Sequence, residues 1–446
     1  SGTVALDGRP LSDMTNGEIF KAIGFVSQNV EDQLWDLSVE DVIAFPMENR
    51  CMSPTEIRRR LTQLIDKFAL AELCGRRVLT LSGGERRMVA IAAAVASQPA
   101  VLVLDEPTTG LDPAARQRLT DILAEVSKSV SSLLLCEQDP TSLLPVVDNI
   151  ALLTDGRLTE PRPATEMISR QSDWTLAGLL SPVRERVPRK ATSPGQPVLA
   201  VSALTTKLSR ARGNPVLDGV NFEVRAGEVT ALIGRNGAGK TTLFKSVMGL
   251  LKVSSGTIEI EGASVEGWTV AARARKIAYI PQNMRHILFN MSVMGEMIFA
   301  ITASKAESDD PAVLQKATAA LERYGISALA EANPFSLSSR QQALLGLSLA
   351  DVTGAPLAIV DEPILARDLE GRRMLERFIG AMRGSGRAVM LISHDLELVD
   401  DLADRLMILK DGTIIYDGSP EEGWRSAAFE TLAWPVPYSS TTVGVA

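Results

Sequence analysis

The sequence contains few of the residues that build disulfide frameworks or metal centres. It has three cysteines, Cys51, Cys74 and Cys136, and two histidines among 446 residues. An odd number of widely spaced cysteines argues against a disulfide framework and favours a reducing compartment. Cys136 lies in the apolar run SSLLLCEQD, where we expect a buried, unreactive thiol. Two histidines exclude a histidine-rich metal site.

Long hydrophobic runs and excess positive charge are also lacking. The best apolar stretch, residues 343–360, is interrupted by Asp351 and Pro356, so no membrane-spanning helix is predicted, and no signal-peptide pattern is present. The net charge of −8 argues against a nucleic-acid-binding protein, because such proteins usually carry a basic surface. The hydrophobic content of 45% with 4% aromatics is typical of a globular α/β protein, and the length predicts two or three domains.

The chain contains an internal repeat. VLVLDEP at residue 101 corresponds to LAIVDEP at residue 357, and LSGGE at residue 81 corresponds to LSSRQ at residue 337. IGFVSQN around Gln28 likewise matches IAYIPQN around Gln282. The matching segments are separated by 254 or 256 residues and occur in the same order, which predicts two homologous domains. In them, residues 53–73 and 311–324 are predicted to form amphipathic helices.

The linker between the repeats is rich in proline. Residues 160–197 contain six prolines, which prevent long helices and strands, and we expect one short helix near Trp174. A position 254 residues before Lys240 would precede Ser1, so we expect an N-terminally truncated first domain without a phosphate-binding loop; a fragment and a truncated gene both fit. The predicted organisation is a first domain at 1–159, a linker at 160–197, a complete second domain at 198–430 and a loose tail at 431–446.

The clearest motif is GRNGAGKTT at residues 234–242. It lies between the apolar segment VTALI and the helical pattern TLFKSVMGL. A strand, a glycine-rich loop and a helix in this order form a P-loop, in which backbone N–H groups converge on phosphates at a helix N-terminus. Lys240 would neutralise the β- and γ-phosphates, and the Thr241 hydroxyl would ligate Mg²⁺. The predicted ATP contacts of this loop are Gly234, Arg235, Asn236, Gly237, Ala238, Gly239, Lys240, Thr241 and Thr242.

The segment LAIVDEP carries a second chemical signal. A continuous apolar run that ends in an acid is typical of a strand buried on both faces of a parallel sheet. Asp361 would hold Mg²⁺ or its water, and Glu362 would polarise the attacking water. The alternative interpretation is an exposed strand end whose acidic residues have no catalytic role. The second copy of the motif, at Asp105 and Glu106, disfavours that alternative.

Residues 81–112, LSGGERRMVAIAAAVASQPAVLVLDEPTTGLD, resemble the signature helix, Walker B strand and D-loop of ABC ATPases. The resemblance covers nearly all of the chain except the linker and the tail. It implies an α/β fold with two P-loop NTPase (RecA-like) ABC ATPase domains, each with a helical subdomain and a small antiparallel β subdomain. It also implies ATP and Mg²⁺ as cofactors, and two ATP sites that each combine the P-loop of one half with the signature of the other.

The resemblance assigns one fully equipped site to the second half. Gln282 resembles the Q-loop glutamine, which would contact Mg²⁺ together with Thr241 and Asp361. His394 resembles the switch histidine, which orients water and contacts the γ-phosphate. Asp368 resembles the D-loop aspartate. The signature of this site would come from the first half, through Ser82, Gly83, Gly84 and Glu85.

The other site departs from the family pattern. The first half keeps Gln28, Asp105 and Glu106, but Gln138 stands where the switch histidine belongs. An amide cannot carry the proton of an imidazole. In the signature of the second half, Ser339 and Arg340 replace two glycines, and Arg340 adds bulk where backbone should approach phosphate. We expect this site to bind ATP but to hydrolyse it slowly or not at all. Residues 205–217 contain no aromatic residue that could stack on adenine.

Residues 25–49 resemble the Q-loop region of energy-coupling factor ATPases, which drive vitamin and cobalt or nickel importers. They contain a second glutamine, Gln33, then an acidic segment and a closing Glu48–Asn49. This resemblance implies a peripheral ATPase on the cytoplasmic face of the membrane, with its halves paired head-to-tail. Its partners would be transmembrane coupling and substrate-binding subunits, with no nucleic acid.

Two other classes stay open. One is a soluble tandem ABC protein acting on ribosomes or DNA, against which the proline-rich linker and the acidic charge argue. The other is an inactive remnant, against which the complete second-half site argues.

Overall fold

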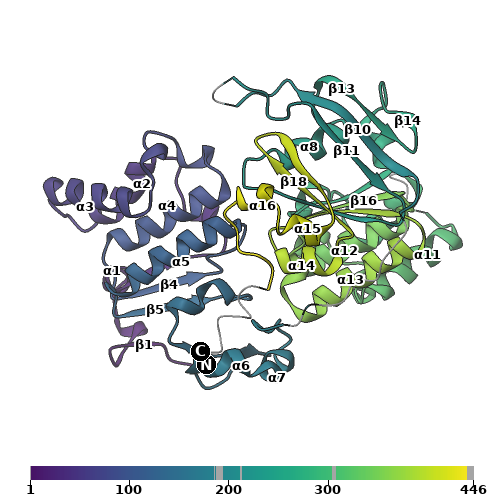
Figure 1. Cartoon of the computed structure of the whole chain (residues 1–446). Helices are drawn as coiled ribbons and strands as arrows, with labels where there is room; N and C mark the ends of the chain where they lie inside the picture. Colours follow the sequence, from purple (N-terminus) through teal and green to yellow (C-terminus); the bar gives the residue numbers. More distant parts are fainter. Residues whose placement is uncertain (1, 185, 187–193, 211–212, 304–307, 439–446) are drawn as a thin grey trace. The chain divides into compact units, whose positions relative to one another are not determined.

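The computed structural model describes residues 2–184, 186, 194–210, 213–303 and 308–438 (Figure 1). The chain forms two compact units, Ser1–Ser169 and Arg170–Ala446. The division falls inside the predicted linker. Two short helices form there instead of the single one expected near Trp174, because no proline interrupts residues 164–181.

The first unit is built around a three-stranded parallel sheet in the order β3-β4-β5. Its apolar core combines one face of this sheet with the buried sides of α2, α4 and α5. The predicted strand at 101–105 forms as β4, and the predicted helix at 53–73 forms as α3 with Ser53 as its N-cap. The elements are β1 (Ala5–Leu6), β2 (Arg9–Pro10), α1 (Asn16–Ala22), β3 (Ile23–Val26), α2 (Val39–Glu48), α3 (Pro54–Lys67), α4 (Gly83–Ala96), β4 (Val101–Asp105), α5 (Pro113–Ser127), β5 (Ser132–Cys136), β6 (Asn149–Ile150), β7 (Leu153–Thr154), β8 (Arg157–Leu158), β9 (Arg162–Pro163) and α6 (Ala164–Ser169).

Cys136 is exposed, so the expectation of a buried thiol was wrong. It ends β5, which lies at the edge of the described sheet and pairs only with β4. On this strand the apolar run of the sequence does not produce burial, and Leu134 is 55% exposed. An apolar strand is buried on both faces only where other elements cover both faces.

The second unit has a six-stranded sheet in the order β15-β16-β17-β12-β18-β19. All neighbours are parallel except β18 and β19. The elements are α7 (Gln171–Leu176), β10 (Pro197–Thr206), β11 (Val220–Arg225), β12 (Val229–Ile233), α8 (Lys240–Val247), β13 (Val253–Ile260), β14 (Ala263–Ser264), α9 (Val270–Ala274), β15 (Ile277–Ile280), α10 (Val293–Thr302), α11 (Pro311–Arg323), α12 (Ser339–Thr353), β16 (Leu357–Asp361), α13 (Leu369–Gly384), β17 (Ala388–Ile392), α14 (Leu396–Leu402), β18 (Arg405–Lys410), β19 (Thr413–Gly418), α15 (Pro420–Gly423) and α16 (Ala427–Glu430).

Two apolar cores lie on opposite faces of this sheet. Leu357 and Ile359 of β16 belong to the core shared with α8 and the antiparallel strands, whereas Ala358 and Val360 belong to the core shared with α10–α13. The alternation follows from the period of two in a strand, and it explains why the whole run is apolar. Figure 1 shows the antiparallel sheet β11-β10-β13-β14 and the helices α11–α13 on opposite sides of the central strands.

Two side chains of the segment after α16 are buried, in contrast to the loose tail expected at 431–446; residues 439–446 of that predicted tail lie outside the described residues. Leu432 is 1% exposed and Trp434 is 6% exposed. Apolar side chains of this size stabilise a fold by leaving water, so they hold the segment against the second unit. Across the described ranges, no helix combines the length and the apolar character needed to cross a membrane.

Candidate active site

The glycine-rich loop joins the fully buried strand β12 to α8, as predicted. A Cβ on Gly234 would lie 2.3 Å from Leu409 O. Gly239 has a φ of +117°, and a Cβ there would lie 2.9 Å from a methyl group of Leu217. Neither position accommodates a side chain, so the backbone itself lines the loop. The N-terminus of α8, at Lys240, therefore faces the end of β12, an arrangement that favours anions.

Lys240 bends back over this loop. Its Nζ donates to Gly234 O at 2.5 Å and to Arg235 O at 3.2 Å, and it lies 3.1 Å from His394 Nε2. The ammonium group is thus held beside the exposed residues Arg235, Asn236 and Gly237 of the loop. A cradle of backbone with one fixed cation has the donor set that phosphate groups require.

Sheet order brings the three predicted motifs together. Strands β16, β17 and β12 are adjacent and parallel, so their carboxyl ends meet at one edge. Asp361 pairs with Ile392, and Leu232 pairs with the same residue from the other side. The loops that follow these strands carry Glu362, His394 and Gly234. Ligand sites of parallel α/β sheets form at this edge.

Glu362 and His394 are joined directly. His394 Nδ1 lies 2.9 Å from Glu362 Oε1, and the backbone N–H of His394 donates to Glu362 Oε2 at 3.2 Å. Glu362 has a φ of +48°, which is a strained value for a residue with a side chain and is typical of functional positions. Burial opposes ionisation of Glu362, but His394 and Lys240 outweigh it and lower the pKa of this carboxyl. An ionised carboxylate at this place can accept a proton.

Asp361 is held by a residue that was assigned no role from the sequence. Tyr279, in β15, donates its hydroxyl to Asp361 Oδ2 at 2.9 Å. Burial raises the pKa of Asp361 to about 6, an effect that the Tyr279 hydrogen bond only partly offsets and that the nearby Glu362 reinforces. Burial and the neighbouring carboxylate also raise the pKa of the Tyr279 hydroxyl.

The predicted Mg²⁺ ligands supply oxygen atoms of the kind that this ion prefers. Thr241 and Gln282 are exposed, and Asp361 Oδ2 carries the Tyr279 bond. No cluster of three or more His, Cys, Asp or Glu side chains suited to a metal occurs in the described part of the chain. One carboxylate, one hydroxyl and one amide fit Mg²⁺ as it is usually held, since it keeps waters and takes other oxygens from phosphates.

The first unit assembles the corresponding residues differently. Glu106 has a φ of +45°, close to that of Glu362. Its carboxylate accepts hydrogen bonds from Gln28 Nε2, Gln138 Nε2 and Thr109 Oγ1, each at 2.9 Å. Asp105 ends β4, as Asp361 ends β16. Neutral amides and a hydroxyl therefore donate to Glu106, whereas the corresponding acid of the second unit, Glu362, contacts the imidazole of His394.

The two signature segments begin with the same type of helix cap and differ at the positions of the two glycines. Ser82 caps α4 in a capping box with Glu85, and Ser338 caps α12 in the same way with Gln341. Gly83 and Gly84 open α4. In α12 the counterpart of Gly84 is Arg340, whose guanidinium lies 2.6 Å from Glu370 and 3.5 Å from Asp368.

Three residues at these sites were assigned no role from the sequence, although Tyr279 and Arg87 lie inside the segments IAYIPQN and LSGGERRM. Tyr279 reads as an ordinary strand residue. Arg87 donates from α4 to the backbone oxygens of Gln28 and Glu106, and only its position on an otherwise apolar helix face hints at burial. Trp434 packs edge-to-face against His394 with ring centroids 5.7 Å apart. Contacts of this kind join residues far apart in the sequence.

Comparisons with known proteins agree with this geometry. The profile described as ABC transporter matches residues 1–109 and 217–365. A Methanosarcina mazei protein inferred to be an ABC transporter ATP-binding protein is 30% identical over 95% of this chain and 80% of its own length. YkoD of Bacillus subtilis strain 168, inferred to be an HMP/thiamine import ATP-binding protein, is 28% identical over 95% of this chain and 81% of its own length.

Solved structures agree on the fold. A chain from ribosome-bound archaeal Pelota and ABCE1 aligns with a TM-score of 0.67 and 21% identity, over 94% of this chain and 68% of that one. The RNase-L inhibitor aligns with a TM-score of 0.63 and 23% identity, over 92% and 76%. At this identity they show the fold alone, and they confirm the predicted α/β architecture with two ABC ATPase domains. The chain therefore belongs to the ABC transporter family, as an ATP-binding, ATP-hydrolysing protein with two ABC regions.

Proposed function

We propose that this chain hydrolyses ATP at the Lys240 site to power import of a small solute, of the vitamin or transition-metal type. It would act as the energising subunit of an energy-coupling factor transporter, peripheral to the cytoplasmic face of the membrane. The observation that carries the hydrolytic part is the continuous contact from Lys240 through His394 to Glu362, at the edge where the P-loop begins.

The contacts of each residue at the Lys240 site favour a specific role in hydrolysis. Lys240 neutralises phosphate charge, and Glu362, kept ionised, orients and deprotonates the attacking water. His394 holds Glu362 through Nδ1 and presents Nε2 to the phosphate side. Thr241, Gln282 and Asp361 would hold Mg²⁺, which when bound offsets the negative charge of the phosphate oxygens.

The glycines of the first signature support head-to-tail pairing of the halves. A Cβ on Gly83 would meet nothing within 4 Å among the described residues. Glycine at a helix start is therefore not demanded by packing within the first unit, although it is a poor helix former. A group that approaches from outside would demand it. We propose that this group is the nucleotide on the Lys240 site and that Ser82, Gly83, Gly84 and Glu85 contact it.

An apolar groove on the first unit is suited to a membrane subunit. It has a volume of about 240 Å³ and lies between the segment after Gln28 and helices α2 and α4. Phe25, Trp35 and Phe45 line it and are 52%, 72% and 46% exposed. Exposed aromatic side chains gathered in one groove are typical of a binding surface. We propose that a segment of the transmembrane coupling subunit presents apolar side chains to this groove.

The import assignment rests on the first Q-loop region and on one relative. Gln33 lines the groove and accepts a hydrogen bond from the backbone N–H of Ser27 at 2.9 Å, so it fixes the turn after β3. The likeness to YkoD, whose assigned name includes import of HMP or thiamine, favours a vitamin precursor among the possible cargoes.

Two measurements test this function. ATPase activity of the full-length protein should fall about 100-fold in Lys240→Ala, because a phosphate-neutralising charge is lost. Wild-type turnover in that variant would refute the assignment of the Lys240 site. Uptake of labelled HMP, thiamine, Co²⁺ and Ni²⁺ should then identify the cargo in cells with and without the gene.

The membrane partner is tested separately. Tagged protein purified from solubilised membranes should retain integral membrane subunits, and Trp35→Asp should lose them. Leu158→Asp is the matched control, because Leu158 is 64% exposed on the same unit and lies outside the groove. Salt-sensitive co-sedimentation with ribosomes, without any membrane partner, would favour the soluble tandem ABC class instead.

A further inference from the structure

The chain after α15 places four buried apolar side chains in the second unit: Trp424, Phe429, Leu432 and Trp434. Trp424 and Phe429 pack on each other edge-to-face with centroids 5.1 Å apart. Trp434 instead packs on the ring of His394, at 5.7 Å and an interplanar angle of 86°. One aromatic residue of this segment therefore touches the proposed active site, and its neighbours do not share that contact.

His394 is constrained around its ring. Nδ1 faces Glu362 at 2.9 Å, and Nε2 faces Lys240 Nζ at 3.1 Å and Gly234 O at 3.4 Å. These contacts lie along the edge of the imidazole. Trp434 adds an aromatic surface, and edge-to-face pairs of this kind are favourable beyond the area they bury. Both residues are only 6% exposed, so the pair is buried.

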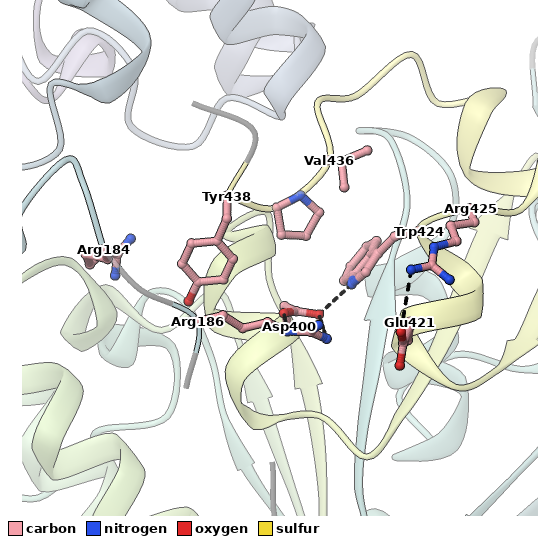
Figure 2. Close-up of a pocket in the computed structure, with 9 residues that line it drawn as sticks. Arg184, Arg186, Asp400, Glu421, Trp424, Arg425, Val436 and Tyr438 are labelled. Carbon is pink, nitrogen blue, oxygen red and sulfur yellow. Dashed lines mark hydrogen bonds and ion pairs between the residues drawn. The ribbon is translucent and has the colours of Figure 1, made fainter. Parts of the chain in front are cut away.

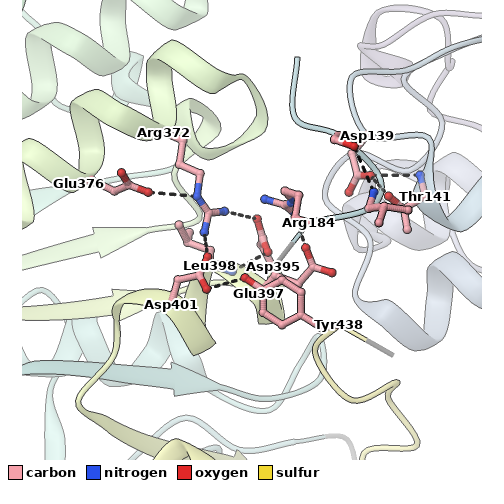
Figure 3. A network of polar contacts seen from close by, with 12 residues as sticks. Asp139, Thr141, Arg184, Arg372, Glu376, Asp395, Glu397, Leu398, Asp401 and Tyr438 are labelled. Atoms are coloured by element: carbon pink, nitrogen blue, oxygen red, sulfur yellow. Dashed lines mark hydrogen bonds and ion pairs between the residues drawn. The ribbon is translucent and has the colours of Figure 1, made fainter. Parts of the chain in front are cut away.

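Two hydrogen bonds fix the chain before and after Trp434. Before it, Leu432 O accepts a hydrogen bond from Arg235 Nε of the P-loop at 3.1 Å. After it, the Tyr438 hydroxyl donates to Asp401 of α14, the helix that follows His394 (Figure 3). The segment 432–438 thus connects the P-loop, the histidine ring and the helix behind it.

Helix α14 is itself fixed by residues of the linker. Arg184 pairs with Glu397 (Figure 3), and Arg186 Nε lies 2.6 Å from Asp400 Oδ2 (Figure 2). Trp424 Nε1 donates to the same Asp400 at 2.7 Å. The backbone next to His394 is anchored in this way, and Trp434 adds an aromatic contact to the imidazole beside the polar contacts at its two nitrogens.

We propose that Trp434 is a positioning residue for ATP hydrolysis at the Lys240 site. It keeps the His394 imidazole in the orientation that points Nδ1 to Glu362 and Nε2 to Lys240. This inference rests on the proposed function, because it assumes that His394 takes part in hydrolysis.

The kinetic test compares three variants of the full-length chain. Trp434→Ala should lower kcat about 10-fold with KM for ATP within about twofold, because a misplaced catalytic group costs turnover rather than binding. Trp434→Phe keeps an aromatic surface and should retain at least about half of the wild-type kcat. Phe429→Ala is the matched control, since it removes a buried aromatic of the same segment that does not touch His394; its kcat should stay near wild type.

A second measurement does not require the Trp434→Ala variant to fold. The chain has only two histidines, so imidazole NMR signals of labelled protein report on His394 and His286 alone. His286 lies in another element, the 3-10 turn Met284–His286. Trp434→Phe should shift the His394 signal through the changed ring current and leave that of His286 in place.

The outcomes separate this inference from the proposed function. Loss of turnover in His394→Ala together with normal kcat in Trp434→Ala would overturn the positioning role alone. Equal losses of kcat in Trp434→Ala and Phe429→Ala, or an unmoved His394 signal in Trp434→Phe, would also overturn it. Wild-type turnover in His394→Ala would remove the role of His394 and the positioning role with it.

Discussion

The two units carry the same acid at the same strand end, but different side chains hold it. Glu106 and Glu362 both follow a parallel strand, both adopt a positive φ, and both donate their backbone N–H to the last residue of the neighbouring strand. Glu106 is surrounded by amide and hydroxyl donors, whereas Glu362 contacts an imidazole that reaches Lys240. The strained backbone is present in both halves, whereas the side chains that contact the acid differ between them.

The neighbouring strands also differ. Strand β17 lies between β16 and β12, and all five of its residues are buried. Its counterpart β5 is at an edge of the described sheet, and Cys136 and Leu134 are exposed there. The two strands have similar apolar sequences, so their difference in burial comes from the neighbours that cover them.

The signature segments complete the comparison. Gly83 and Gly84 open α4 without side chains, while Arg340 in α12 is tied to Asp368 and Glu370 of its own unit. A guanidinium at that position blocks close approach of a phosphate to the helix start. The difference predicts one fast site and one slow site.

The largest expected effect comes from neutralising the two acids in turn. Glu362→Gln should lower ATP turnover about 100-fold or more, because a general base is lost, whereas Glu106→Gln should stay within about threefold of wild type. Steady-state ATPase assays of the full-length protein measure both. Equal losses in the two variants would abolish the proposed asymmetry.

The next largest effect is expected from exchanging the corresponding residues of the two signature segments. Gly84→Arg should lower turnover at the Lys240 site by about 100-fold, because a bulky cation would occupy the place of a backbone phosphate contact. Arg340→Gly is the reciprocal control. It removes half-exposed ion pairs and places a glycine in the first turn of α12, so it should lower the free energy of unfolding by no more than about 2 kcal/mol and leave turnover at the Lys240 site intact. Normal activity in Gly84→Arg would contradict the pairing of the first signature with the Lys240 site.

The smallest effect concerns stability. Because the pKa of Asp361 is raised to about 6, the folded state binds its proton more tightly than the unfolded state, and stability is lost as pH rises through this range. At pH 7 without nucleotide, Asp361→Asn should stabilise the protein by about 1–2 kcal/mol, or a few degrees in Tm. Thermal unfolding at pH 7 and pH 5 measures this. The advantage should shrink at pH 5, where wild-type Asp361 is protonated; an advantage independent of pH would exclude burial of the charge as its cause.

Most of the secondary structure near the site followed from local patterns. The strand at 229–233, the loop at 234–239 and the helix from Lys240 lie where the P-loop motif places them. The strands at 101–105 and 357–361 and the helix at 311–323 also form as predicted. These features depend on the spacing of apolar residues and on the conformations open to glycine. Both are set by residues that are close together in the sequence.

Contacts between distant segments were not predictable in the same way. Tyr279 reaches Asp361 across 82 positions of sequence, and Trp434 reaches His394 from a segment that composition alone indicates to be loose. Cys136 was expected to be buried and is exposed. In each case the outcome depends on which element lies beside the residue, and no local pattern specifies that neighbour.

The sequence by itself determined the repeat, the family motifs and the substitutions that distinguish the two halves, Gln138 and Arg340. The tertiary structure decided which side chains meet at those motifs: His394 between Glu362 and Lys240, Tyr279 on Asp361, and Trp434 on His394. The physical reason is the strand order of the sheet. Carboxyl ends of β16, β17 and β12 become neighbours only when the parallel strands pair. Pairing places Ile392 beside Asp361, 31 positions before it, and beside Leu232, 160 positions before it.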